Sequence, residues 1–259
     1  MSILSPEAFL KKQVAAVQEY SILSGTAIAD LFSRPRYWDD IFTQMDSIGV
    51  GSMPIIILTG FFTGCVLALQ SATALKEFGA VSMTGSLVSL SMVKELGPVL
   101  TGLMVSGRNA AGMASEIGSM KVTEQIDAMR ALGTDPIRKL VTPRLVATMF
   151  MLFFLTIVAD AAGITGGTLV SVSMLGLNGR TYLNNSYTGL VHGDIVQGLT
   201  KPIFSGFIIA TVGCYFGMKT TGGTQGVGRA TTQAVVVSAV FIIVVDFLLT
   251  RVMIGIFGS

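Results

Sequence analysis

Two neighbouring residues of opposite charge, Lys94 and Glu95, lie in the middle of a long apolar stretch and are followed by Pro98. Ionisable side chains inside a membrane-length segment are costly and usually mark a functional cavity or an interior contact. Successive side chains on a helix diverge by about 100°, so these two cannot simply neutralise each other. Pro98 removes the amide that would bond back to Lys94, which favours a kink. The pattern predicts a polar patch in a cavity, or else separate pairs with charges on other helices, for which Asp160 and Asp246 are available.

The composition predicts that such a stretch crosses a membrane. Of 259 residues, 51% are hydrophobic and only 12% are charged, whereas an average soluble domain carries roughly 25% charged residues. A surface facing lipid explains the deficit, so the chain is predicted to be an all-α integral membrane protein. The net charge of +2, without a basic stripe interleaved with aromatic residues, gives no indication of nucleic-acid binding.

Five apolar stretches are each long enough to cross a hydrocarbon core about 30 Å thick with roughly 20 helical residues. They are placed near 48–74, 81–118, 144–175, 195–218 and 231–256. Residues 1–45 precede them and predict an amphipathic helix that ends in basic and aromatic residues, typical of the bilayer interface. A soluble cytoplasmic arm is the alternative for that segment. Without a linker or repeat, residues 1–259 are interpreted as one domain, with the membrane bundle over 46–259.

The distribution of Lys and Arg predicts the orientation of the spans. Ten of the 17 fall in the N-terminal segment, in the loop 119–143 and in the loop 219–229, and Arg144 lies at the membrane edge next to them. The opposite side holds only Lys76 and Arg180 clear of the spans. The N-terminus and the loop 119–143 are therefore predicted to be cytoplasmic, and the loop 176–194 is predicted to lie outside.

The cytoplasmic loop is predicted to contain a short amphipathic helix at about 121–132. Its apolar residues recur at helical spacing: Val122, Ile126, Met129 and Leu132. Gly133 is well placed as a C-terminal cap, and Glu124, Asp127 and Arg130 fall on the polar side. A helix of this kind suits docking to a cytoplasmic partner. A helix that merely lies on the membrane surface is the alternative.

No catalytic or cofactor chemistry is predicted for the chain itself. The Gly-rich tract 222–231 lacks the spacing of a phosphate-binding loop and is interpreted as a tight turn, with the last helix beginning at Ala230. One histidine is present, without a metal-ligand cluster or a Ser/His/Asp set. Transport against a gradient would require another subunit to hydrolyse nucleotide.

Small residues four apart predict close helix packing. The pairs are Gly60 with Gly64, Gly102 with Ser106, Gly163 with Gly167, and Gly213 with Gly217.

Several ordered motifs then stand together over residues 45–257. They are Lys94-Glu95-Leu96-Gly97-Pro98, Gly107-Arg108, Glu116-Ile117-Gly118, Thr123-Glu124-Gln125 through Met129, Asp135-Pro136, and Gly222-Gly223 leading to Arg229-Ala230-Thr231-Thr232. In this order and spacing they resemble the MlaE/YrbE family, the permease subunits of ABC-type lipid transporters.

The resemblance implies an interfacial helix followed by five membrane helices, working as a homodimer in the inner membrane of a bacterium. The cargo would be phospholipid moved between inner and outer membranes, which maintains outer-membrane lipid asymmetry. A cytoplasmic ABC ATPase (MlaF-like) would dock on the coupling helix at Glu124, Gln125, Ile126, Asp127, Met129 and Arg130. The other implied partners are a periplasmic hexamer of MCE-domain proteins (MlaD-like) and, in some systems, a STAS-domain protein (MlaB-like).

The family's lipid cavity, carried over to this chain, would be lined by Leu67, Ala74, Leu75, Phe78, Lys94, Glu95 and Leu96, with Lys201 from the fourth span. Apolar side chains suit acyl tails, and a cation suits a head-group phosphate. Two positions depart from the family pattern. Lys94 is often Arg in relatives, which would offer a bidentate fork rather than a point charge. Phe78 stands where an aromatic hydroxyl can occur.

Three alternatives remain. The first is an ABC permease for another hydrophobic cargo such as sterol. The second is an ion-coupled secondary transporter using the mid-span charges, against which five spans without an inverted repeat argue. The third is a non-transporting scaffold, which would have no use for charges in mid-span.

Overall fold

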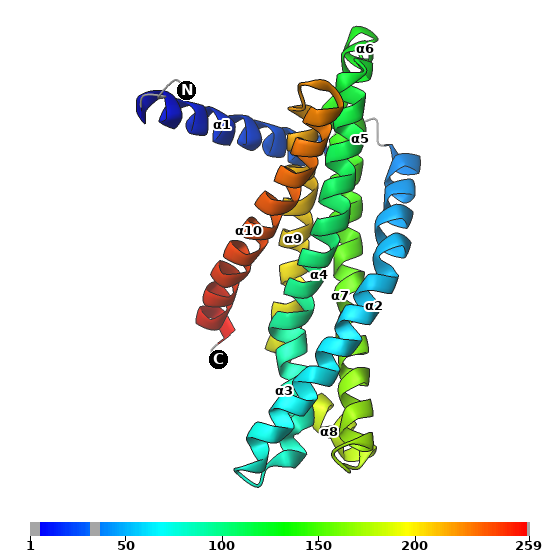
Figure 1. Cartoon of the computed structure of the whole chain (residues 1–259), viewed down its shortest axis with the longest axis vertical. Helices are drawn as coiled ribbons and strands as arrows, with labels where there is room; N and C mark the ends of the chain where they lie inside the picture. Colours follow the sequence, from blue (N-terminus) through cyan, green and yellow to red (C-terminus); the bar gives the residue numbers. More distant parts are fainter. Residues whose placement is uncertain (1–5, 32–36, 258–259) are drawn as a thin grey trace.

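The computed structural model describes residues 6–31 and 37–257, and all regular structure in these two ranges is helical (Figure 1). Five helical segments in them are long and apolar enough to cross a membrane. They are Trp38–Lys76, Val81–Val122, Ile137–Ser173, His192–Met218 and Gly223–Ile256. The all-α fold and the five predicted spans are confirmed.

Four of the five spans begin earlier than predicted, the first and the last by the largest margins. The first, α2 (Trp38–Lys76), starts at Trp38 rather than near 48, because Asp39 and Asp40 in its first turn favour a helix N-terminus. The last, α10 (Gly223–Phe257), starts within the Gly-rich tract, so the predicted start at Ala230 is wrong. The turn before it uses Gly222 and Gly223, whose positive φ angles of 87° and 65° suit glycine.

The N-terminal helix, α1 (Pro6–Asp30), lies across one end of the bundle instead of joining it (Figure 1). It is held by side chains of the fourth span. The hydroxyl groups of Tyr20 and Thr211 are hydrogen-bonded at 2.8 Å, and the Tyr215 hydroxyl donates to the carbonyl of Ala16 at 3.3 Å. The predicted helix ahead of the five spans is thereby confirmed.

The second span is a chain of short pieces rather than one helix. In order they are η1 (Val81–Met83), α3 (Thr84–Ser91), η2 (Met92–Leu96), α4 (Gly97–Val105), η3 (Ser106–Ala110) and α5 (Ala111–Val122). Both η2 and η3 are single π-helical turns, a feature frequent at functional sites. The break expected at Pro98 therefore takes the form of a π turn just before it.

The remaining elements complete the bundle. After α6 (Gln125–Ala131) come η4 (Ile137–Val141), α7 (Thr142–Ser173), α8 (Gly179–Thr188) and α9 (His192–Met218). The segments α1 and α6 and the turn from α9 to α10 share one end, whereas α8 and the start of α3 lie at the other (Figure 1).

Glycines set the closest approaches between helices. A Cβ on Gly60 would lie 2.7 Å from the carbonyl oxygen of Ala159, and one on Gly64 would overlap the carbonyl of Gly163. The helices α2 and α7 consequently touch backbone to backbone. Gly213 and Gly217 of α9 pack in the same way on α5 and its preceding turn. The close packing predicted from small residues is confirmed at these interfaces.

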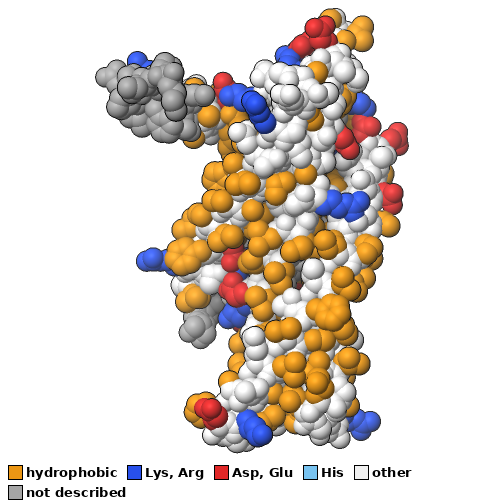
Figure 2. Space-filling model, viewed as in Figure 1, with side chains coloured by type: hydrophobic (Ala, Val, Ile, Leu, Met, Phe, Trp, Pro, Cys, Tyr) orange, Lys and Arg blue, Asp and Glu red, His pale blue; other side chains and the backbone are white. Residues whose placement is uncertain are grey.

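The surface matches a chain that sits in a bilayer. On the face drawn in Figure 2, hydrophobic side chains dominate the middle of the molecule and charged ones gather mostly at its two ends. One group of acidic and basic side chains interrupts the apolar belt beside α10 (Figure 2).

Candidate functional site

Lys201 is the centre of an ionic network inside the bundle. Its side chain is 1% exposed, and three oxygens from other elements surround its ammonium nitrogen. They are the backbone carbonyl of Lys94 at 2.9 Å, the carboxylate of Glu95 at 2.5 Å and the carboxylate of Asp246 at 3.2 Å. An ammonium group carries three donors and no acceptor, so this arrangement uses its whole capacity.

The carbonyl of Lys94 explains why a lysine is needed there. Pro98 lacks the N–H that would bond to it, and the Gly97 N–H instead reaches back to Met92 in the π turn. The Lys201 ammonium replaces the missing donor at 2.9 Å. An unpaired carbonyl within a membrane would cost several kcal/mol, so Lys201 stabilises the break in the second span as well as neutralising acids.

Lys94 and Glu95 point to different partners, as expected for adjacent helical residues. The Lys94 ammonium pairs with Asp194 at 3.0 Å, while Glu95 also accepts a hydrogen bond from the Thr250 hydroxyl at 3.2 Å. Of the two alternatives left open by the sequence, pairing across helices is therefore realised. Asp246 takes part through Lys201, but Lys94 pairs with Asp194 rather than with either aspartate that the sequence offered.

Asp160 is buried outside this network. Its carboxylate lies against Gly97, where a Cβ would collide with the Oδ1 atom. That oxygen has no hydrogen-bond partner among the residues that the structure describes. Asp160 therefore occupies the space beside the broken helix without pairing with Lys94 or Glu95.

Two hollows run along the second half of α2, next to the π turn η2. The first, of about 360 Å³, is lined by Leu67 and Leu96 among others; the second, of about 550 Å³, is lined by Ala74 and Phe78. Gln70 borders both, so the two hollows are adjacent, and together they are called the groove. Leu96 of η2 lines the first hollow and directly follows Glu95 in the chain, although Lys94 and Glu95 themselves line neither hollow.

The structure thus places the carried-over cavity residues in two neighbouring sets. Leu67, Leu96, Ala74 and Phe78 line the groove, and Leu75 is half-buried beside them. Lys94, Glu95 and Lys201 form the ionic set, in which Glu95 is 39% exposed and Lys94 is 23% exposed. Lys201 cannot contact cargo in this arrangement, because its ammonium is enclosed. Asp194 and Thr250 were not predicted from the sequence, since neither lies in a recognisable motif.

The predicted coupling helix is shorter than expected and turned differently. Val122 ends α5, and α6 comprises Gln125–Ala131. Ile126 is fully buried and Met129 partly buried in the chain's own core, whereas Val122 and Leu132 are exposed, so only half of the predicted apolar stripe faces inward. Gly133, with φ of 77°, ends the helix as predicted.

The outer face of α6 is polar. Asp127 accepts hydrogen bonds from Lys121 at 2.9 Å and from Arg130 at 3.3 Å, and the bond from Lys121 lowers the pKa of Asp127. Glu124, just before α6, has a left-handed φ of 61°. Such a conformation in a non-glycine residue costs about 1–3 kcal/mol and tends to occur at functional sites. Of the residues predicted to couple, Glu124, Gln125, Asp127 and Arg130 are exposed.

Comparison with known proteins fits this architecture. The family model described as Permease MlaE matches residues 41–252. The chain belongs to the MlaE permease family. A probable ABC transporter permease protein of Rickettsia bellii is 43% identical over 91% of each chain. The intermembrane phospholipid transport system permease protein MlaE of Haemophilus influenzae is 36% identical over 85% of each chain.

A plant protein is also similar to this chain. The chloroplastic protein TRIGALACTOSYLDIACYLGLYCEROL 1 of Arabidopsis thaliana is 34% identical over 88% of this chain and 65% of its own length. The MlaE family match covers all five spans and the ionic network, including Lys94, Glu95 and Lys201. The chain is accordingly a multi-pass membrane protein of the ABC permease type.

Proposed function

We propose that this chain is the membrane subunit of an ABC transporter that moves phospholipids between the inner and outer membranes of a bacterium. The observation that carries the proposal is the π turn η2, which contributes Leu96 to the groove and also holds the partly exposed charges of Lys94 and Glu95. A phospholipid has the same two parts, an apolar tail and a charged head group. The name of the Haemophilus influenzae relative supports this cargo.

The groove and the ionic network would bind different parts of the lipid. Leu67, Ala74, Leu75, Phe78 and Leu96 would contact acyl chains by burying apolar surface. Lys94 would interact with a head-group phosphate as a point charge, after partly leaving Asp194. Glu95, more exposed, would accept hydrogen bonds from the head group. Lys201 would act as a positioning residue that holds Glu95 and the broken helix in place.

The end of the molecule with α1 and α6 is inferred to be cytoplasmic. Its segments carry most of the Lys and Arg residues, and such residues favour the cytoplasmic side of a membrane. The N-terminus would then be cytoplasmic and α8 periplasmic. A separate cytoplasmic ATPase would dock on the polar face of α6, where Glu124, Gln125, Asp127 and Arg130 are exposed. Ile126 and Met129 would transmit its movement inward, because both contact the core.

The assembly inferred for the protein is a homodimer with further subunits on both sides. The outer face of α10 exposes large apolar side chains, including Val240, Phe247 and Val252, which suits lipid or a second copy. A periplasmic MCE-domain hexamer would receive or deliver lipid at the α8 end. A STAS-domain protein would join the ATPase in the cytoplasm.

Mass spectrometry of lipids that co-purify with the detergent-solubilised protein tests the cargo. We expect phospholipid bound to the wild type and lost from the double variant Lys94→Ala/Glu95→Ala. The matched control, Asp127→Ala/Arg130→Ala, also removes one acid and one base, but at the other end of the bundle, and should retain the lipid. Equal lipid in all three samples would mean unspecific surface binding and would contradict the site. If sterol co-purified instead of phospholipid, the proposed cargo would be wrong, although the groove could still be its binding site.

The same two variants test coupling when they are reconstituted with the ATPase. Stimulation of ATP hydrolysis should fall in the Asp127→Ala/Arg130→Ala protein, although its lipid content is unchanged. Normal stimulation of ATP hydrolysis in that variant would contradict a coupling role for α6.

A further inference from the structure

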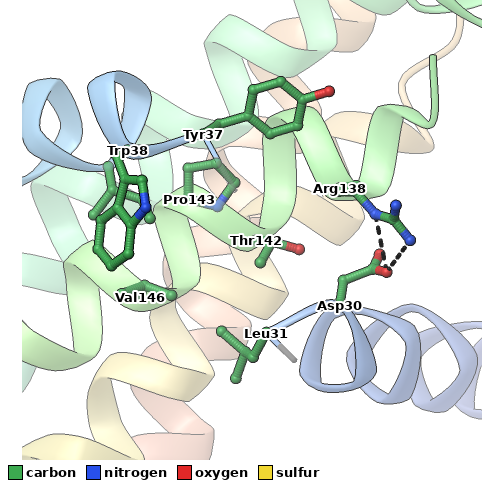
Figure 3. Close-up of a pocket in the computed structure, with 9 residues that line it drawn as sticks. Asp30, Leu31, Tyr37, Trp38, Arg138, Thr142, Pro143 and Val146 are labelled. Atoms are coloured by element: carbon green, nitrogen blue, oxygen red, sulfur yellow. Dashed lines mark hydrogen bonds and ion pairs between the residues drawn. The ribbon is translucent and has the colours of Figure 1, made fainter. Parts of the chain in front are cut away.

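A second elongated hollow lies at the opposite end of α2 from the groove described above. Its upper part, about 220 Å³, is enclosed by the end of α1, the start of α2 and the start of α7 (Figure 3). Its lower part, about 470 Å³, continues between α7 and α9. Leu31 and Val146 line both parts, so the two are directly adjacent. The hollow is therefore one site with two chemically different halves.

The upper half contains a cation and an anion side by side. The Arg138 guanidinium donates two hydrogen bonds to the Asp30 carboxylate, from Nε at 3.2 Å and from Nη2 at 2.8 Å. Figure 3 shows this pair at one side of the hollow and the Trp38 ring at the other. Tyr37 also lines it, and tyrosine and tryptophan are typical of the membrane–water boundary. The mouth thus offers both charges at the level of lipid head groups.

The lower half is apolar throughout. Phe150, Phe153 and Phe154 of α7 line it together with Ile203 of α9. From Val146 to Phe154 the helix rises about 12 Å, whereas one leaflet of a 30 Å hydrocarbon core is about 15 Å deep. The groove has the length of one acyl chain within a single leaflet.

We propose that this hollow binds a resident membrane phospholipid with an amine-bearing, zwitterionic head group. The head-group phosphate would contact Arg138, its ammonium would contact Asp30, and one acyl chain would lie on the three phenylalanines. Charge complementarity favours this occupant: the neutral Arg–Asp pair matches a zwitterion, and an apolar surface of acyl-chain length lies next to it. The site is separate from the cargo groove, because Trp38 and Leu67 are about 40 Å apart along α2.

The protein supplies its own probe, because Trp38 is the single tryptophan of the chain. The full-length protein is reconstituted in phosphatidylcholine vesicles with increasing fractions of bromine-labelled lipid, which quenches tryptophan fluorescence on contact. Brominated phosphatidylethanolamine, phosphatidylcholine and phosphatidylglycerol are compared. Choline has no N–H to donate to Asp30, and glycerol has no cation. We expect half-maximal quenching at a roughly tenfold lower fraction of the ethanolamine lipid, as one hydrogen bond to a charged group would give.

Three variants keep the test decisive. Asp30→Asn/Arg138→Gln should abolish the preference for the ethanolamine lipid. The swapped pair, Asp30→Arg/Arg138→Asp, retains both charges and should keep the preference, which separates charge from folding. The control Lys121→Gln/Asp127→Asn removes a charge pair elsewhere and should keep the wild-type quenching preference for the ethanolamine lipid. Equal quenching by all three lipids, or a preference that survives Asp30→Asn/Arg138→Gln, would overturn the proposal. Absence of quenching by any lipid would mean that protein fills the hollow, which would also overturn it.

Discussion

The helices α9 and α10 are consecutive spans of similar composition, yet they are attached to the bundle in opposite ways. In the most apolar 18-residue stretch of α9, 61% of the residues are buried, against 11% in α10. Gly198, Gly206 and Gly217 of α9 each meet a neighbouring element closely enough that a Cβ would collide with it, and a Cβ on Gly213 would lie 3.1 Å from the carbonyl oxygen of Ala110. In α10, by contrast, nothing approaches Gly228 or Gly255 within 4 Å.

A single stripe attaches α10. Its buried residues Ala230, Ala234, Ser238 and Ile242 recur four apart, the spacing that keeps side chains on one face. The same line continues through Asp246 and Thr250, which contact Lys201 and Glu95. Ser238 forms a hydrogen bond with Ser106 at 2.6 Å. Hydropathy identifies both helices as spans. Only the positions of small and polar residues show that α9 is packed on several sides, whereas α10 contacts the bundle along one stripe.

Among variants of α9 and α10, the largest loss of stability is expected when Lys201 of α9 is replaced. Replacing it with methionine removes the ammonium that joins two carboxylates and the Lys94 carbonyl, and breaking a buried ion pair costs about 3–5 kcal/mol. Asp246→Asn on α10 should cost about 1 kcal/mol, because the amide oxygen still accepts a hydrogen bond. Thermal unfolding in detergent, followed by circular dichroism, compares the two variants.

A triple variant separates the charge from the packing of Lys201. In Lys201→Met/Glu95→Gln/Asp246→Asn no carboxylate is left unpaired, so most of the lost stability should return. If Lys201→Met and Asp246→Asn destabilised the protein equally, α10 would be anchored as firmly as α9 and the contrast between them would fail.

The next effect concerns the glycines of α9. A side chain at Gly198 would collide with the backbone carbonyl of Val93 in η2, so Gly198→Leu should destabilise the protein by about 2–3 kcal/mol through overpacking. The matched control is Gly255→Leu, because Gly255 faces open space on α10. It should leave the unfolding temperature nearly unchanged. Comparable losses from both substitutions would show that the exposed face of α10 is covered in the purified protein.

Much of the fold could be predicted because its causes are local in the sequence. Five apolar stretches, small residues four apart and the cap at Gly133 each depend on a few neighbouring residues. The pairing of Lys94 with Asp194 could not be predicted, because Asp194 lies in the first turn of α9 and the contact depends on where that helix enters the bundle. The inward turn of Ile126 also depends on the core around α6, which amphipathic spacing alone does not describe.

The smallest effect is expected from the exposed charges of α6, which lie outside both helices. The hydrogen bond from Lys121 holds the pKa of Asp127 below its ordinary value of 3.8. A carboxyl group with a lowered pKa stabilises the folded state above its ordinary pKa, and this contribution is lost as the pH falls through the folded value. Between pH 7 and pH 5 the wild-type contribution should therefore be constant. Because exposed ion pairs contribute little, Asp127→Asn should give the same unfolding temperature as the wild type at both pH values. A clear loss at pH 7 would mean that a surface pair fixes α6, in contrast to Lys201, whose effect depends on burial.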